Sequence, residues 1–205
     1  MESLQQKATS FYKQMSTRRS VREFSNKKID TDILLECIKA AGTAPSGANK
    51  QPWFFSIVEN EFLKKKIRIA AEEEEFQFYK NRADDEFLGD LKQFNLDWQK
   101  PHLEDASALI VIFSKTSQIT DEKKERCYYP KESVGIATGI LITALHNLGI
   151  HQLTHTPNPM SFLNMLLERP KEEKPFLILA VGYKSQSFNP IETVKKQISE
   201  IAQVY

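Results

Sequence analysis

The sequence is poor in cysteine, in glycine and in long apolar runs, and it has almost no excess of charge of either sign. Its 205 residues include 28 Lys and Arg against 27 Asp and Glu, so the formal net charge is +1. A protein dedicated to nucleic acid needs a basic excess or a basic face, and no Lys/Arg stripe with interleaved aromatics is present. The composition therefore argues against a nucleic-acid partner.

The two cysteines, Cys37 and Cys127, stand far apart, form no CxxC pattern and have no histidine at metal-ligand spacing. We therefore expect no disulfide framework and no metal site, and a reducing compartment. The longest apolar runs, ALIVIF and ILITAL, are far below bilayer length, and residues 1–15 lack the apolar stretch of a signal peptide. These features predict a cytoplasmic protein without a membrane partner.

The seven glycines form neither GxGxxG nor GxxxxGK[ST], the two common glycine-rich phosphate-binding patterns. A nucleotide-like cofactor would have to be held by side chains and by scattered backbone amides. Serine hydrolase chemistry is not indicated either, because Ser46, the serine beside a glycine in a turn, lacks the GxSxG context.

Apolar periodicity predicts a single α+β domain over residues 1–205, with neither an internal repeat nor a low-complexity linker. A helix begun by Asp30 or Thr31 is expected to end near Gly42. The other predicted elements are helices over 2–15 and 133–149, and strands over 53–58, 109–113 and 176–181.

The segment from about residue 72 to residue 102 is heavily charged and has apolar side chains only at scattered positions. Helices that pack lightly on the body of a domain have this composition. The segment could be a lid or a solvated helical hairpin. Composition alone favours the hairpin.

Arg18, Arg19 and Arg22, with Ser20 among them, directly follow the first predicted helix. Arginine offers forked, permanently charged donors that suit a phosphate and the carbonyl edge of a flavin. Clustered arginines are also typical of solvated surfaces and of ion pairs. The cluster alone is therefore compatible with both a cofactor site and a plain surface.

A second candidate is Pro45-Ser46-Gly47-Ala48, just past the end of the predicted second helix. Pro45 and Gly47 indicate a tight turn that exposes the amides of Gly47 and Ala48 to an anion. An ordinary helix-to-strand turn would have the same composition.

Taken together, RRSVREF and, some two dozen residues later, AGTAPSGANKQPW resemble the motifs of the nitroreductase-like flavoproteins in order and spacing. The resemblance extends from about Arg18 to the 190s and is closest to the iodotyrosine deiodinase branch, because residues 67–82 and 90–100 resemble its lid, here placed at about 72–102. It implies a central mixed β-sheet flanked by helices, FMN as cofactor, and a homodimer with exchanged terminal segments.

The resemblance also implies site residues. Thr156 would donate its hydroxyl to flavin N5, which favours one-electron steps over hydride transfer, and the amide of Ala48 would face the substrate phenolate. Glu75 would receive the substrate ammonium, and Tyr79 and Lys100, the latter on a second lid helix, would contact its carboxylate. The positions expected to contact FMN are Arg18, Arg19, Ser20, Arg22, Pro45, Ser46, Gly47, Thr154, His155, Thr156 and Lys196.

The activity implied is FMN-dependent reductive dehalogenation of halotyrosines to tyrosine and halide, with a separate NAD(P)H-dependent flavin reductase as a candidate electron donor. Two alternatives stay open: a general NAD(P)H-dependent nitro- or quinone reductase of the same fold, and a non-catalytic flavin-binding module. Glu75, Tyr79 and Lys100 discriminate them, because only an amino-acid substrate calls for an anion and a cation together with a neutral donor.

The chain departs from the family pattern at two places. His155 stands where a further threonine is usual; it could contact the flavin, titrate near neutral pH, or point away from the site, the interpretation we favour. Near the C-terminus the usual phosphate-binding arginine is replaced by Lys195-Lys196. We assign Lys196, with a register uncertainty of about one residue.

Overall fold

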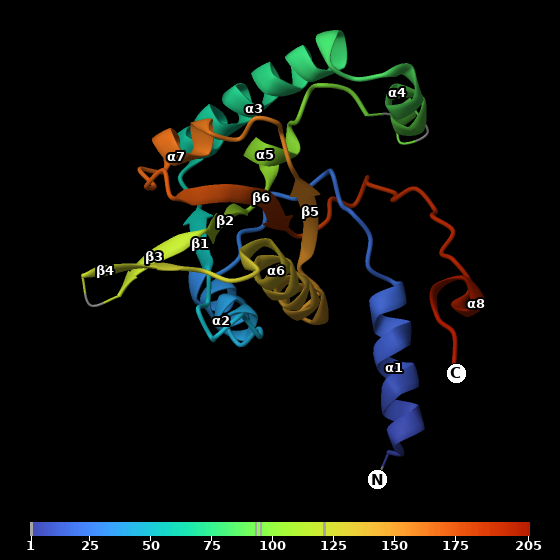
Figure 1. Ribbon diagram of the computed structural model, residues 1–205. Coiled ribbons are helices and arrows are strands. Elements are labelled where there is room, and N and C mark those ends of the chain that lie inside the picture. Colours follow the sequence, from blue (N-terminus) through green and yellow to red (C-terminus); the bar gives the residue numbers. More distant parts are fainter. Residues whose placement is uncertain (1, 93, 95, 121) are drawn as a thin grey trace.

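The computed structural model combines helices and strands, and it describes residues 2–92, 94, 96–120 and 122–205 (Figure 1). The helices are α1 (Leu4–Ser16), α2 (Thr31–Ala41), α3 (Glu61–Asn81), α4 (Asp85–Lys92), α5 (His102–Asp105), α6 (Pro130–Asn147), α7 (Phe162–Leu166) and α8 (Ile198–Ile201). The strands are β1 (Trp53–Val58), β2 (Ala108–Lys115), β3 (Ser117–Thr120), β4 (Lys123–Arg126), β5 (His151–His155) and β6 (Glu173–Gly182).

The central sheet has the strand order β1-β2-β6-β5, and each of these neighbouring pairs is antiparallel. A parallel bridge between Ser20 and Gln152 extends the sheet beyond β5 and makes it mixed. Helices cover both faces, with α2 and α6 on one side and α3, α5 and α7 on the other (Figure 1). The predicted α+β class and the mixed sheet flanked by helices are confirmed.

The side chains of strand β2 contribute to the cores on both faces of the sheet. Leu109, Val111 and Phe113 belong to the core under α3, α5 and α7, whereas Ile110 and Ile112 belong to the core over α2 and α6. This follows from the two-residue period of a strand, which sends successive side chains to opposite faces. A continuous apolar run such as ALIVIF is what a doubly covered strand requires.

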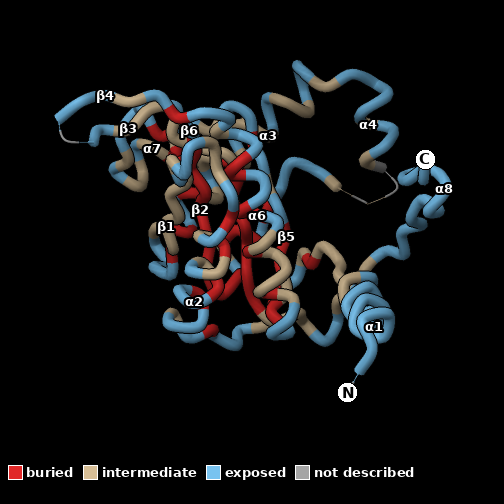
Figure 2. Tube along the Cα trace, turned by 60° about the horizontal axis from the view of Figure 1, so that its bottom comes forward, coloured by how far each residue is buried: buried red, intermediate tan, exposed pale blue. Residues whose placement is uncertain are grey.

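The predicted helices and strands are present, with ends that differ by a few residues. Asp30 caps α2 by accepting a hydrogen bond from the amide of Asp32 (3.0 Å), and Gly42 is its C-cap, as expected. The prediction had not included β5, α7 or the β3–β4 hairpin. Figure 2 shows that the buried chain gathers in the sheet and α6, while α1, α4 and α8 are exposed along most of their length.

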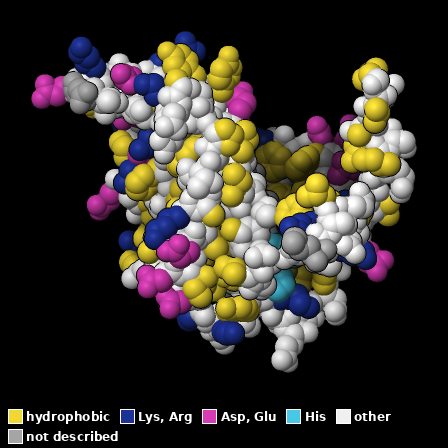
Figure 3. Space-filling model, turned by 90° about the horizontal axis from the view of Figure 1, so that it is seen from below, with side chains coloured by type: hydrophobic (Ala, Val, Ile, Leu, Met, Phe, Trp, Pro, Cys, Tyr) yellow, Lys and Arg dark blue, Asp and Glu magenta, His cyan; other side chains and the backbone are white. Residues whose placement is uncertain are grey.

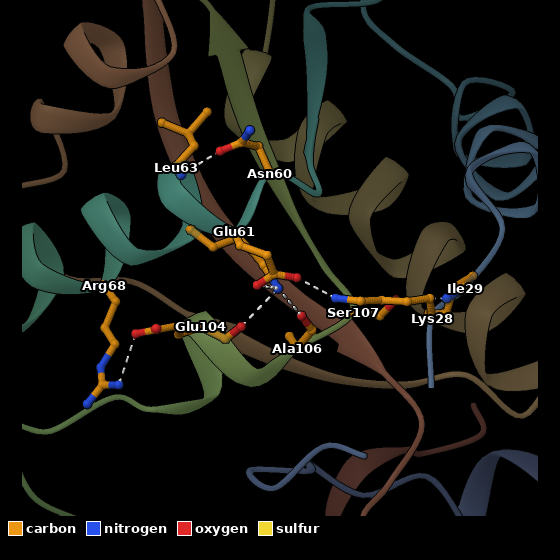
Figure 4. Close-up of polar contacts among 10 residues, drawn as sticks. Lys28, Ile29, Asn60, Glu61, Leu63, Arg68, Glu104, Ala106 and Ser107 are labelled. Carbon is orange, nitrogen blue, oxygen red and sulfur yellow. Dashed lines mark hydrogen bonds and ion pairs between the residues drawn. The ribbon is translucent and has the colours of Figure 1, made fainter. Parts of the chain in front are cut away.

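The base of α3 is fixed by a buried lysine. Lys64 is fully buried, and its Nζ donates to the carbonyls of Glu104 (2.9 Å) and Ala106 (2.6 Å) and lies 3.0 Å from a carboxylate oxygen of Glu61. Glu61 also pairs with Lys28 at the surface (Figure 4). A buried charge is tolerated only with such partners, so this network anchors α3 to the start of β2 and sets the direction of the helix.

The distal half of α3 leaves the core. Ala71 is the last fully buried residue of the helix, and beyond it the side chains are partly or fully exposed. The predicted lid at about 72–102 thus begins within a continuous helix and continues through α4 to the start of α5; its positions 93 and 95 lie outside the described residues.

Candidate functional site

The segment after α1 runs beside the edge strand β5. The amide of Val21 donates to the carbonyl of Gln152 (3.3 Å), next to the Ser20–Gln152 bridge. This pairing brings the arginine motif, residues 18–22, alongside the end of β5 where Thr154 and His155 lie. Two motifs more than 130 positions apart in the sequence therefore meet at one edge of the sheet.

Three adjoining cavities open at this edge. The largest, about 650 Å³, lies between Arg22 and Glu23, the end of β5, the α4–α5 loop and residues 187–191. It shares Arg22 with a cavity of about 220 Å³ beside the arginine motif, and it shares Lys100 with one of about 260 Å³ under the distal half of α3. The shared walls make them one groove that connects the arginines with the predicted substrate-binding residues.

The guanidiniums at one end of this groove have no carboxylate partner among the residues that the structure describes. Arg19 donates only to the main-chain carbonyls of Ser16 (2.7 Å) and Arg18 (2.9 Å). Burial lowers the pKa of Arg22. Partly buried arginines without a counter-ion form an anion site, so this end of the groove fits the phosphate of the predicted FMN.

The C-terminal tail reaches the same cavity. Its walls include Arg18, Arg19, Ser20 and Lys195, and Lys196 is not among them. Of the two lysines between which the sequence left the register uncertain, Lys195 therefore lines the cavity beside the arginines. A lysine there adds a point charge to the arginine forks.

At the other end of the groove, Glu75 and Lys100 form an ion pair. The Nζ of Lys100 lies 3.2 Å from Oε2 of Glu75, and the two side chains are 9% and 14% exposed. Tyr79, one turn after Glu75, faces the same cavity, with the Lys100 Nζ 5.3 Å from the centre of its ring. Burial and, secondarily, the charges of Glu75 and Asp97 raise the pKa of the Tyr79 phenol, so it is a neutral donor. The structure brings the three predicted residues together.

Lys100 does not lie on a second lid helix, as predicted, but in the loop between α4 and α5. The loop is fixed by Glu72, whose Oε1 accepts from the amide of Lys100 (2.6 Å) and from the Nε of Arg68 (2.8 Å). Unlike the exposed Glu73 beside it, Glu72 is largely buried, with its side chain 14% exposed. It connects α3 to the loop that carries the cation.

His155 points inward, not away from the site. Its side chain is 10% exposed, and its Nε2 lies 4.0 Å from Oε1 of Glu75. The ring packs edge-on against His102, with centroids 5.5 Å apart. Burial first, and then the charge of Lys100, lowers the pKa of His155 to about 3, which rules out a titration near neutral pH. His102 is buried at the start of α5, and burial lowers its pKa to about 3.

Thr154 and Thr156 are exposed on the face of β5 and its extension opposite to His155. The two-residue alternation of the strand separates the hydroxyls from the imidazole. Thr154 lines both the large cavity and the one under α3, and Thr156 lines the latter. Both threonines thus lie at the groove and are exposed.

The turn at Pro45–Ala48 lies elsewhere, because none of the three cavities includes any of its residues. Gly47 pairs with Tyr128, and a Cβ on Gly47 would come within 2.8 Å of the Tyr128 Cβ. Ala48 and Asn49 then take left-handed conformations, with φ of 50° and 54°. The turn is well defined, but within one chain the structure does not bring it to the groove.

Across the described part of the chain, no three His, Cys, Asp or Glu side chains gather as a metal site would require. No helix among those residues is both long and apolar enough to pass through a bilayer.

The residues that sequence reasoning missed are those that act through tertiary contacts. The Arg68–Glu72 pair has the four-residue spacing of a helical ion pair, and that was the available signal. Nothing local indicated that the same carboxylate binds the amide of Lys100, and nothing local placed His102 beside His155.

Comparison with known proteins bears on this groove. A sequence model of the nitroreductase family matches residues 15–183. The iodotyrosine deiodinase of Haliscomenobacter hydrossis is 44% identical over 205 residues, which are 100% of this chain and 92% of that protein. The iodotyrosine deiodinase of Hydra vulgaris is 38% identical over 98% of this chain and 74% of its own.

Among solved structures, the chain is similar to oxidized iodotyrosine deiodinase bound to FMN and 3-iodo-L-tyrosine. The TM-score is 0.81 with 33% sequence identity, over 91% of this chain and 96% of that one.

Proposed function

Because the chain belongs to the nitroreductase family and, within it, to the iodotyrosine deiodinases, we propose that it catalyses the FMN-dependent reductive deiodination of iodotyrosine. The resemblance inferred from the two sequence motifs is confirmed. The reaction exchanges the ring carbon's iodine for hydrogen: the substrate takes up two electrons and one proton and releases tyrosine and iodide. FMN supplies the electrons when it is bound in its reduced form.

The observation that carries this function is the Glu75–Lys100 ion pair in the groove. A free amino acid is a zwitterion, so its recognition calls for an anion and a cation held a head group apart. We assign Glu75 to the ammonium, and Lys100 and the Tyr79 hydroxyl to the carboxylate. Charge-assisted hydrogen bonds of this kind are the strong ones. A nitro- or quinone reductase would have no use for such a pair.

For the cofactor, we assign the phosphate to the arginine end of the groove. Support comes from Arg18, Arg19 and Arg22, which lack a carboxylate partner among the described residues, and from Lys195 in the same cavity. Thr154 and Thr156 are exposed and line the groove. We assign Thr156 to flavin N5, where a hydroxyl that donates favours one-electron transfer over hydride transfer.

The distance of the Pro45–Ala48 turn from the groove supports a homodimer in which the partner subunit supplies that turn. Helix α1 has no buried residue within its own chain, although it carries Phe11 (55% exposed) and Tyr12. On α6, a Cβ at Gly139 would meet nothing within 4 Å, and Ile136 is 47% exposed. Apolar faces of this kind mark an interaction surface. Figure 3, viewed from below, shows hydrophobic side chains spread over this side of the molecule.

Helices α1 and α8 project from the body on the same side, so they are well placed to exchange with a second copy (Figure 1). We propose that they do, and that the single domain carries its lid at about 72–102 over the substrate head group. In this arrangement the amide of Ala48 faces the substrate phenolate across the dimer interface.

The chain carries no glycine-rich dinucleotide-binding pattern. We therefore propose that electrons come from a separate NAD(P)H-dependent flavin reductase. Cys37 and Cys127 are both free and buried, which supports a reducing, cytoplasmic setting.

The function is tested on the purified protein with FMN. Oxidised FMN absorbance is followed while iodotyrosine or tyrosine is added, and iodide is measured after anaerobic reduction with dithionite. We expect tight binding of iodotyrosine, weak binding of tyrosine, and one iodide released per monoiodotyrosine. Reduction of nitroaromatics with NAD(P)H in the absence of iodide release would instead establish the general reductase.

A further inference from the structure

The imidazole of His155 is buried, lines the groove and has an unused nitrogen. Its side chain is 10% exposed, and no group among the described residues hydrogen-bonds its Nε2. A buried polar atom without a partner is costly, and buried polar atoms are normally paired. Oε1 of Glu75 lies 4.0 Å from this nitrogen, which is too long for a hydrogen bond.

The two carboxylate oxygens of Glu75 face different groups. Oε2 lies 3.2 Å from the Nζ of Lys100, and Oε1 faces His155. An amino-acid head group bound between Glu75 and Lys100 must separate this ion pair, because its ammonium takes the place of Lys100 at Oε2. Glu75 then loses its direct contact with the lysine while it stays largely buried, and Oε1 needs a donor.

We propose that His155 is a positioning residue for the substrate ammonium: its Nε2–H donates to Oε1 of Glu75 once the head group has separated Glu75 from Lys100. The hydrogen bond fixes the carboxylate with Oε2 directed at the ammonium. This inference rests on the proposed function, because it concerns how the same groove recognises an amino acid.

The surroundings of His155 suit this role. Burial and the nearby Lys100 keep the imidazole neutral, and a carboxylate only accepts hydrogen bonds, so the tautomer with hydrogen on Nε2 is required. The edge-on contact with His102 limits the rotation of the ring. Its Nε2 faces Glu75, the residue assigned to the ammonium, so His155 serves the amino-acid end of the substrate and not its ring.

The test compares iodotyrosine with 2-iodophenol, which has the same halogenated ring but no head group. In His155→Leu we expect the Kd and KM for iodotyrosine to rise about tenfold, while kcat changes less than about twofold. Binding of 2-iodophenol should be unchanged. In His155→Gln, whose amide nitrogen can reach the position of Nε2, most of the affinity should return. His155→Met repeats the test if the leucine variant does not fold.

Wild-type affinity for iodotyrosine in both apolar variants would overturn the proposal, as would an equal loss for 2-iodophenol. These outcomes are distinct from failure of the proposed function, which would appear in the unmodified protein as a lack of iodotyrosine binding and of iodide release.

Discussion

The Nζ of Lys100 and the carboxylate of Glu75 are 3.2 Å apart in a groove where both side chains are at least four-fifths buried. The pair joins the distal half of α3 to the loop before α5. A zwitterion bound here would replace this one ion pair by two, one at its ammonium and one at its carboxylate. A neutral aromatic molecule can form neither, so the groove discriminates amino acids from neutral aromatics by charge and not by apolar contact.

Removal of the charge on Glu75 is expected to weaken iodotyrosine binding. Glu75→Gln keeps the shape of the side chain but deprives the ammonium of its anion, so the loss should be about 1–3 kcal/mol. The Kd from flavin absorbance measures it. Glu73→Gln, a change in the exposed neighbour, is the matched control and should bind like the wild type. Equal affinity in both variants would show that Glu75 does not receive the ammonium.

Glu72 is expected to act on the substrate without touching it. Glu72→Gln weakens the acceptor for the amide of Lys100 and for Arg68, which loosens the loop that carries the cation. We expect the KM for iodotyrosine to rise by a factor of roughly five, about 1 kcal/mol, with FMN affinity unchanged. If Glu73→Gln raised the KM for iodotyrosine as much as Glu72→Gln, the cause would be the lost negative charge of the glutamate run and not a loosened Lys100 loop.

Two inactive variants are expected to restore activity to each other if the partner subunit completes the site. Arg22→Glu opposes the phosphate, and Ala48→Glu opposes the phenolate. Coexpressed in equal amounts, they would form half heterodimers, each with one intact site, so the specific activity should be about a quarter of the wild-type value. Were both residues to serve a site within one chain, the mixture would stay inactive. Size-exclusion chromatography must show dimers throughout.

Sequence alone could predict those parts of the site that depend on local pattern. The arginine motif, the Pro45–Ala48 turn and the Thr154–Thr156 segment could be recognised from their order along the chain, without any knowledge of packing. The run ALIVIF indicated a strand covered on both faces, and β2 is one. In contrast, β5 reads HQLTH, a short and polar edge strand, and nothing in its pattern distinguishes it from a loop.

The rest depends on contacts between distant segments. In the sequence, Glu72 cannot be distinguished from the other three glutamates of the run, because all four lie on one helix. What distinguishes it is the hydrogen bond that it accepts from the amide of Lys100, 28 residues later. His155 could have been directed inward by the strand alternation, since Thr154 and Thr156 were assigned to the flavin. Its neighbours Glu75 and His102 lie on other elements, so these contacts and its unpaired nitrogen had no local signal.

The hydroxyl of Thr156 is expected to set the balance between deiodination and nitroarene reduction. Thr156→Val removes the donor at nearly constant volume, so iodide release should fall by at least tenfold, about 1.4 kcal/mol, while nitroarene reduction is retained or raised. Thr156→Ser keeps the hydroxyl and should retain the wild-type ratio. The ratio of the two rates, measured with one reductant at saturating FMN, is the readout. An unchanged ratio in Thr156→Val would assign the hydroxyl elsewhere.

Acidification is expected to destabilise the fold through the buried histidine pair well before the carboxylates are protonated. His102 and His155 have folded-state pKa values of about 3, lowered chiefly by burial, whereas an unfolded histidine titrates at about 6.5. Between these values the unfolded chain binds protons that the folded chain excludes, so the free energy of unfolding falls as the pH falls. From pH 7 to pH 5 the loss is about 2 kcal/mol for each histidine.

Thermal unfolding over this range at constant FMN checks the predicted loss, with His102→Leu and His155→Leu each expected to reduce the dependence of stability on pH. Comparison of each variant with itself at the two pH values separates the titration from the general cost of the substitution. A slope that both variants share with the wild type would mean that the two imidazoles take up protons in the folded protein, and that the groove is wetter than the packing of His155 against His102 implies.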